Sequence, residues 1–247
     1  MSDLSEAIPI AETFYSIQGE GPTMGVPSVF LRVSHCNLRC PAWGPPGSPQ
    51  GCDTTDVWSK VWRRMTPEHL IEYWEQVQYA EALRRGAHLI LTGGEPMLWQ
   101  PRLAALLQLL FERVVRLVRV EVETNATIMP QQGFASLVGQ WNCSPKLESA
   151  GNALEKAYVP NVLRYFADDP RAIFKFVVQE TWDLLEIFDK YVHEFDIARS
   201  RVWLMPEAAT QERLLERSGK VAEQAKEYGF NFSSRLQLVI YDRAVGV

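Results

Sequence analysis

Short apolar runs alternate with longer segments of helical period along most of this chain, and this alternation limits the folds it can adopt. A strand followed by a helix and then by another strand favours a parallel sheet covered by helices. The predicted strands span residues 28–33, 88–92, 118–123, 140–144, 172–178, 202–205 and 235–241. The pattern is typical of an α/β fold, either an incomplete βα barrel or an open doubly wound sheet.

The predicted helices occupy the gaps between these strands. Thr66 precedes Pro67 and Glu68, a capping residue followed by proline in the first turn, so a helix should run from there to about Arg85. The other helices are expected near residues 101–116, 130–138, 181–194 and 210–228. Residues 41–51, PAWGPPGSPQG, are too rich in Pro and Gly for a helix or a central strand, which predicts a loop.

Size and charge exclude several classes of protein. The chain has 247 residues with 47% hydrophobic content, which suits one domain that spans residues 1–247. A formal net charge of -5 gives no basic surface for nucleic acid, which needs clustered Lys and Arg. The N-terminus lacks the regions of a signal peptide, and no apolar run is long enough for a membrane span. We therefore expect a cytoplasmic protein without nucleic-acid or membrane partners.

Three cysteines stand close together around the Pro/Gly-rich loop. Cys36, Cys40 and Cys52 have the spacing C-x3-C-x11-C, which suits metal or redox chemistry better than a disulfide framework. A 4Fe-4S cluster held by three thiolates keeps one iron open for a small molecule. A structural zinc site completed by Cys143 or a histidine fits the spacing equally well, and simply buried thiols are a further alternative. We expect Cys143 itself to be a small buried thiol inside a strand.

Polar groups also follow the ends of three predicted strands. The first is Leu91-Thr92-Gly93-Gly94-Glu95-Pro96, whose glycines permit close approach of a ligand and whose Glu95 can accept hydrogen bonds from an ammonium group. The others are the segments 121–125, EVETN, and 142–146, NCSPK. Ligands of parallel βα folds bind beyond the carboxyl ends of the strands, so these groups should converge. Each could instead be an ordinary turn or helix cap.

Together these motifs resemble a known superfamily. CNLRC, followed by CDT and then by GGEP, resembles the radical S-adenosylmethionine (SAM) enzymes, although their usual spacing is C-x3-C-x2-C and the second gap here is longer. The segment 14–21, FYSIQGEG, is similar to the F-x-x-[IL]-Q-G-E-G signature of 7-carboxy-7-deazaguanine synthases. The resemblance implies an incomplete TIM-like βα barrel of the radical SAM type, with the insertion at 41–51 in the cluster loop.

The resemblance also implies roles for individual residues. A 4Fe-4S cluster would be held by Cys36, Cys40 and Cys52. Mg²⁺ would be bound by Thr54. The pterin substrate would be contacted by Ile17, Gln18, Gly19, Glu20, Arg32, Thr92 and Val247, with Arg32 pairing with its carboxylate. SAM would be bound by Gly51, Asp53, Gly94, Glu95, Glu123, Asn125, Ser144, Pro145, Lys146 and Met205.

Two segments depart from the family pattern, and one lysine is open to two interpretations. Many relatives have Gln-Pro where this chain has Met205-Pro206, and the family sequence L-Q-[LT]-H-K ends here with Val239 and Ile240 in place of His and Lys. Lys175 interrupts the apolar run IFKFVV. It either points into the barrel or belongs to an edge strand, where an exposed lysine is ordinary.

The implied activity is that of a carbon-nitrogen lyase. A 5′-deoxyadenosyl radical made from SAM would abstract hydrogen from 6-carboxy-5,6,7,8-tetrahydropterin, and ring contraction with loss of ammonia would give 7-carboxy-7-deazaguanine, a step of queuosine biosynthesis. The implied partners are the pterin, an external flavodoxin-like electron donor and a second copy of the chain in a homodimer. Two alternatives are a radical SAM activase that acts on a partner protein and a zinc-binding module without catalysis.

Replacing Cys36 with Ala should abolish cluster binding, because two thiolates cannot hold three irons of a 4Fe-4S cluster. Iron and sulfide analysis after anaerobic reconstitution measures this. Full iron content in the variant would contradict the ligand assignment, and zinc without iron or sulfide in the unmodified chain would exclude the radical interpretation.

Overall fold

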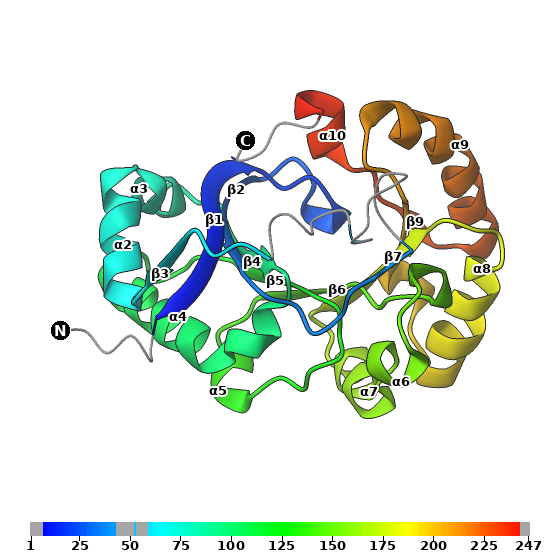
Figure 1. Ribbon diagram of the computed structural model, residues 1–247, viewed down its shortest axis with the longest axis horizontal. Coiled ribbons are helices and arrows are strands. Elements are labelled where there is room, and N and C mark those ends of the chain that lie inside the picture. Colours follow the sequence, from blue (N-terminus) through cyan, green and yellow to red (C-terminus); the bar gives the residue numbers. More distant parts are fainter. Residues whose placement is uncertain (1–6, 43–51, 53–58, 243–247) are drawn as a thin grey trace.

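The computed structural model describes residues 7–42, 52 and 59–242, which form a curved mixed sheet with helices along its outer side (Figure 1). The described strands form one nine-stranded sheet in the order β3-β1-β2-β4-β5-β6-β7-β8-β9. Because β3 and β9 are edge strands and do not pair with each other, the sheet stays open. The predicted incomplete βα barrel is therefore confirmed. In the same ranges, no helix is both long and apolar enough to cross a membrane.

Seven strands of this sheet run parallel to one another. They are β2 (Pro27–Val33), β4 (His88–Gly93), β5 (Val120–Thr124), β6 (Gln140–Cys143), β7 (Ala172–Val178), β8 (Val202–Pro206) and β9 (Asn231–Phe232). Two further strands, β1 (Ile8–Ile17) and β3 (Arg63–Met65), extend the sheet in antiparallel fashion beyond β2. The strand pattern of the sequence predicted β2 and the parallel strands β4 to β8, but it missed β1, β3 and the short parallel strand β9.

The helices connect these strands. They are α2 (Pro67–Gln76), α3 (Tyr79–Arg84), α4 (Gln100–Arg113), α5 (Gln132–Ala135), α6 (Leu154–Ala157), α7 (Pro160–Asp168), α8 (Asp183–Glu186), a π-helical turn (Ile187–His193), α9 (Gln211–Tyr228) and α10 (Leu236–Tyr241). Four 3-10 turns cover Gly21–Thr23, Pro96–Trp99, Glu148–Ala150 and Arg199–Arg201. The Thr66 side chain accepts a hydrogen bond from the His69 backbone N–H, as the predicted cap requires.

Two predictions of local structure were wrong. The expected helix from Thr66 to Arg85 is two helices, because Gln78 adopts a left-handed backbone with φ 67° and interrupts it between α2 and α3. The expected strand over residues 235–241 is the helix α10. A short apolar run does not distinguish a strand from a helix, and here the Leu236 N–H donates to the Gly19 carbonyl instead of joining a sheet.

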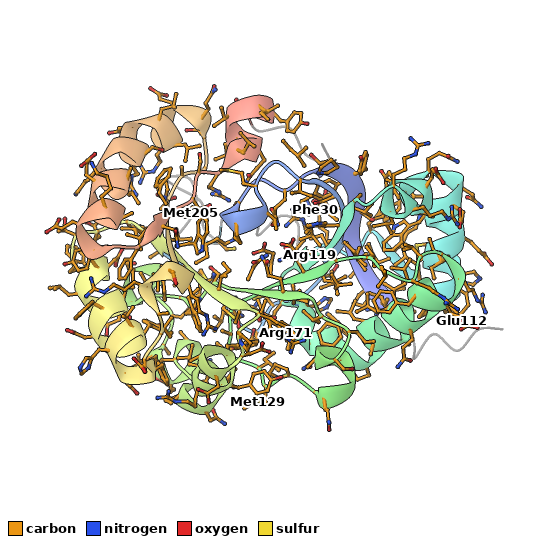
Figure 2. The ribbon with its side chains drawn as sticks, turned by 180° about the vertical axis from the view of Figure 1, so that it is seen from behind. Phe30, Glu112, Arg119, Met129, Arg171 and Met205 are labelled. Carbon is orange, nitrogen blue, oxygen red and sulfur yellow. The ribbon has the colours of Figure 1, made fainter. Side chains whose placement is uncertain are left out.

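The two faces of the sheet have different compositions. Val120 and Val122 of β5, and Phe174 and Phe176 of β7, belong to the main hydrophobic core between the sheet and the helices. Alternate residues of a strand point to opposite faces, so Glu121, Glu123 and Lys175 face inward. Figure 2 shows Phe30 and Met205 on the inner side, whereas Glu112 of α4 lies on the outside. The inner face therefore carries the polar groups that the sequence placed near strand ends.

Gly93, the last residue of β4, and Gly94 bring the end of this strand against the cysteine-bearing loop. Gly94 donates to the Val33 carbonyl at 3.1 Å, and Glu95 donates to the His35 carbonyl at 2.8 Å. A Cβ at Gly94 would lie 2.0 Å from the His35 carbonyl oxygen, a distance that backbone atoms cannot accommodate without moving. Gly93 also has a φ of +135°, which side chains rarely tolerate. Both positions therefore require glycine, whatever ligand binds there.

Replacing Gly94 with Ala should lower the free energy of unfolding by about 1 to 3 kcal/mol, because the new methyl group overlaps backbone atoms of the cysteine loop. Gly219 in α9 is the matched control, since no atom lies within 4 Å of its added Cβ. There, alanine should stabilise the helix by about 0.5 to 1 kcal/mol. Urea unfolding measures both, and a Gly94→Ala variant as stable as the unmodified chain would contradict the packing described.

Candidate active site at the carboxyl ends of the strands

Cys36, Cys40 and Cys52 meet at one small apolar cluster. Cys40 is part of its buried centre, with Leu38, Ala150, Val177 and Met205, and both Cys36 and Cys52 pack against it. As placed, however, no three His, Cys, Asp or Glu side chains in the described ranges are grouped so that they could hold an ion. The fold therefore gathers the predicted thiols at one place, while their role as ligands stays a prediction.

Burial keeps the Cys36 sulfur protonated when it has no cation beside it. Burial is the main cause that raises the pKa of this thiol to about 11; the nearby charges of Glu95 and Cys40 act in the same direction, and the Leu38 N–H and Lys146 oppose them. A metal ligand must be a thiolate, so binding a cation here must release a proton. Cys143 lies in the main core with no exposed surface, as the sequence predicted for a small buried thiol.

Glu95 joins two of the predicted motifs. Its carboxylate accepts hydrogen bonds from the Met97 N–H at 3.0 Å and from the Thr124 hydroxyl at 2.8 Å. The Asn125 N–H donates to its other oxygen at 2.7 Å. The side chain has no exposed surface, and burial raises its pKa although these donors oppose the rise. A carboxylate has about four acceptor sites, so one further donor can still be accommodated.

A buried ion-pair cluster occupies the inner face of the sheet. The Lys175 ammonium donates to Glu20 Oε2 at 2.5 Å and to Glu123 Oε2 at 2.8 Å. Glu20 Oε1 accepts from the Gln237 amide at 2.9 Å and from Arg235 Nε at 3.3 Å. We call these five residues the Lys175 cluster. Burial raises the pKa of Glu20, but the charges of Lys175 and Arg235 outweigh it and bring this pKa down to about 2.

The N-terminal signature approaches the Lys175 cluster through Gln18. Its amide donates to Glu123 Oε1 at 3.3 Å, and the same Glu123 oxygen accepts from the Asn142 amide at 3.0 Å. The Gln18 carbonyl oxygen accepts from the N–H of Gly19 at 2.9 Å. Amide, carboxylate and ammonium groups from widely separated segments therefore meet in one place. Such a set can recognise a flat heterocycle that has both donors and acceptors on its edge.

Comparison with known proteins decides the family. The chain is 33% identical over 244 residues to the 7-carboxy-7-deazaguanine synthase of Pyrobaculum aerophilum, covering 97% of both chains. It is 34% identical to the synthase of Hyperthermus butylicus, covering 97% of this chain and 95% of that one. The synthase of Halobacterium salinarum is 32% identical, with 96% and 92% covered. No family model matches.

This chain belongs to the 7-carboxy-7-deazaguanine synthase family. The resemblance drawn from the sequence motifs is therefore confirmed. The crystal structure of QueE from Escherichia coli has the same fold, with a TM-score of 0.65 and 22% identity, covering 93% of this chain and 94% of that one.

The family's expected substrate residues lie in two places on the inner face. Glu20 belongs to the Lys175 cluster, Gln18 donates to its Glu123, and Gly19 lies against its Gln237. Arg32 lies farther along β2, opposite Thr92 in the sheet register, and its guanidinium pairs with Glu12 at 2.6 Å. Ile17 ends β1. Val247 lies outside the described residues, as do Gly51, Asp53 and Thr54.

The expected SAM residues surround the cysteines. The Asn125 amide donates to Asn37 at 2.9 Å and points toward the Cys36 sulfur at 4.0 Å. The Lys146 ammonium donates to the carbonyl and the hydroxyl of Ser144, each at 2.8 Å. Pro145, which lies between Ser144 and Lys146 in the sequence, is buried. Met205 packs in the apolar cluster around Cys40, and Gly94 lies against the backbone of His35. Glu123 differs, because it lies in the Lys175 cluster with the substrate residues.

Three residues of the Lys175 cluster were not assigned from the sequence. Lys175 was left between two interpretations, and the structure selects the inward one, since β7 lies between β6 and β8 and Lys175 is only 3% exposed. A lysine alternating with phenylalanines in a central strand was the available signal. Arg235 and Gln237 gave no comparable signal, because the run that contains them was interpreted as a strand.

Replacing Lys175 with Met should lower the free energy of unfolding by about 3 to 5 kcal/mol, because it leaves two carboxylates buried without their cation. The loss should be smaller at about pH 5 than at about pH 8. Burial raises the pKa of Glu123, and the charge of Lys175 opposes that rise. Without Lys175, the pKa of Glu123 should therefore be higher still. A carboxyl whose pKa is raised on folding destabilises the fold only at a pH where it is ionised.

Lys226 supplies the control for this prediction. It pairs with Glu223 on the surface of α9, and both side chains are more than two-thirds exposed, at 71% and 73%. Replacing Lys226 with Met should change stability by less than about 0.5 kcal/mol at either pH. Urea unfolding at both pH values measures the two variants. Equal losses in both would contradict a structural role for the buried cluster.

Proposed function

We propose that this chain converts 6-carboxy-5,6,7,8-tetrahydropterin into 7-carboxy-7-deazaguanine with loss of ammonia, as a radical SAM lyase. The observation that carries the proposal is the similarity to 7-carboxy-7-deazaguanine synthases along almost the whole of both chains. The polar set of the inner face supports it, because its amide, carboxylate and ammonium groups suit the donor and acceptor edge of a pterin.

The cofactors are those that the family implies, a 4Fe-4S cluster and SAM. Three thiols are the ligand type that such a cluster takes, Cys36, Cys40 and Cys52 share one apolar cluster of side chains, and N–H groups donate to two of the sulfurs, which supports the proposed site. When bound, the cluster and SAM supply the one-electron chemistry that starts hydrogen abstraction. Gly94, Glu95, Asn125, Ser144 and Lys146 would line the SAM site, together with Pro145 and Met205.

The inner face would hold the substrate and keep water away from it. Glu20 stays ionised across the physiological pH range, because the charges of Lys175 and Arg235 hold its pKa near 2, so it can accept hydrogen bonds from pterin N–H groups. Gln18 contributes an amide beside it, whose nitrogen donates to Glu123. Arg32 would bind the substrate carboxylate. That carboxylate would either pair with Arg32 alongside Glu12 or take the place of Glu12 as the partner of Arg32.

Mg²⁺ bound by Thr54, an external flavodoxin-like electron donor, a cytoplasmic location and a homodimer complete the proposal. The metal, the electron donor and the homodimer follow from the family resemblance of the sequence motifs. Mg²⁺ prefers oxygen ligands and retains several waters, so a single hydroxyl together with the substrate carboxylate is a reasonable ligand set. Reconstitution with and without Mg²⁺ separates the metal from the rest of the proposal.

Anaerobic assay of the reconstituted chain with SAM, a chemical reductant, Mg²⁺ and the carboxytetrahydropterin tests the activity. We expect 7-carboxy-7-deazaguanine and ammonia in equal amounts, identified by mass spectrometry and an ammonia assay. The Cys36→Ala variant is the control and should form neither. An intact cluster that cleaves SAM without consuming the pterin would refute the substrate, and would favour an activase that acts on a protein.

A further inference from the structure

Asn152 holds the segment between the first two cysteines through three hydrogen bonds. Its side-chain oxygen accepts from the backbone N–H of Arg39 at 3.1 Å and from that of Cys40 at 3.0 Å. Its amide nitrogen donates to the Cys40 sulfur at 3.3 Å. Asn152 lies 112 positions away from Cys40 in the sequence, just beyond the 3-10 turn Glu148–Ala150.

The two backbone donors fix the orientation of the Asn152 amide. An amide oxygen and nitrogen are chemically distinct, and only the oxygen can accept from two N–H groups. The nitrogen is therefore directed at the Cys40 sulfur, which lies on the other side. This assignment depends on the network around the side chain and not on the placement of a single atom.

The backbone of Cys40 needs such support. Its φ is 47°, in the left-handed region that residues with a side chain seldom adopt, and it keeps this conformation only where neighbouring contacts require it. The same neighbouring segment adds a further contact, since the Ala42 N–H donates to the Ala150 carbonyl at 3.3 Å. A Cβ on Gly151 would lie 3.1 Å from the Pro41 ring. Residues 150–152 therefore form a support against which the start of the cysteine loop is packed.

We propose that Asn152 is a positioning residue for the iron-sulfur cluster, which fixes the Cys40 loop through its oxygen and raises the cluster's reduction potential through the N–H···S bond. The inference rests on the proposed ligand role of Cys40. A hydrogen bond to a ligand sulfur stabilises the reduced cluster, which carries one more negative charge, and such bonds are among the factors that set cluster potentials. Asn152 touches neither substrate nor SAM in this role.

Two variants separate the functions of the oxygen and the nitrogen. Asn152→Asp keeps an acceptor for both backbone N–H groups but replaces the donor to sulfur with a negatively charged oxygen. It should retain the full iron and sulfide content while the reduction potential shifts to more negative values. Asn152→Ala removes both functions, so it should lose at least half of its iron during desalting. Asn161→Asp on α7 is the control for the added charge. Among the described contacts, the Asn161 side chain makes one hydrogen bond, accepted from the Val162 N–H at the start of the same helix.

The potential is measured by anaerobic redox titration followed by electron paramagnetic resonance of the reduced cluster. Alkylation of Cys40 in the apoprotein is followed by mass spectrometry. It should be several-fold faster in Asn152→Ala than in the unmodified chain, because Cys40 is only 4% exposed while the hydrogen bonds of Asn152 hold it in place. An Asn152→Asp potential equal to that of the unmodified holoenzyme would overturn the inference and leave the proposed function intact. An unmodified chain that binds no iron-sulfur cluster would overturn both.

Discussion

The ammonium group of Lys175, held between Glu20 and Glu123, is the interaction on which the inner face of this structure depends. Removing two carboxylates from water is costly unless a cation compensates them with short hydrogen bonds, and Lys175 makes one to each. Glu20 belongs to the N-terminal signature and Glu123 to β5, while Gln237 and Arg235 come from the beginning of α10. Glu20 thus connects segments from both ends of the chain, and Lys175 joins it to β5.

This arrangement explains how an open sheet keeps a defined inner face. The sheet does not close through strand pairing, since β3 and β9 remain at its edges. The gap between its ends is instead crossed by polar contacts, among them the bond from Leu236 to the Gly19 carbonyl. Figure 1 shows α10 near this open side, next to α9, and Gln211 at the start of α9 donates to the Val239 carbonyl at 3.2 Å. A substrate pocket can therefore form from groups that belong to no single strand.

A second constraint operates through the backbone. The turn after β4 lies so close to the cysteine loop that any side chain at Gly94 would overlap the His35 carbonyl. The two hydrogen bonds across this contact place the proposed SAM-binding turn and the proposed cluster loop at a fixed separation. Asn152 supports the same loop farther along, at Arg39 and Cys40, and lies in the segment that follows β6. Cys36 and Cys40 are thus located by two separate sets of contacts.

Sequence by itself determined the family, the parallel strands and the motifs at their ends, because these depend on residues that are close together in the chain. Periodicity identifies a strand such as β7 from its own seven residues. The motifs FYSIQGEG and GGEP are each recognised from a short continuous segment, without knowing which residues they contact. The structure then agreed with the incomplete barrel that those motifs implied. Errors arose where local pattern was ambiguous, as in the run from Leu236 to Tyr241, which is helical.

Only the tertiary structure decided which groups meet. Lys175 and Glu20 are 155 positions apart, and Asn152 and Cys40 are 112 apart, so no local pattern could pair them. Whether Lys175 faced inward depended on the position of β7 within the sheet, which is set by its pairing with β6 and β8. The physical reason is that strand and helix propensities act over a few residues, whereas ion pairs and hydrogen bonds act through space once the sheet has brought distant residues together.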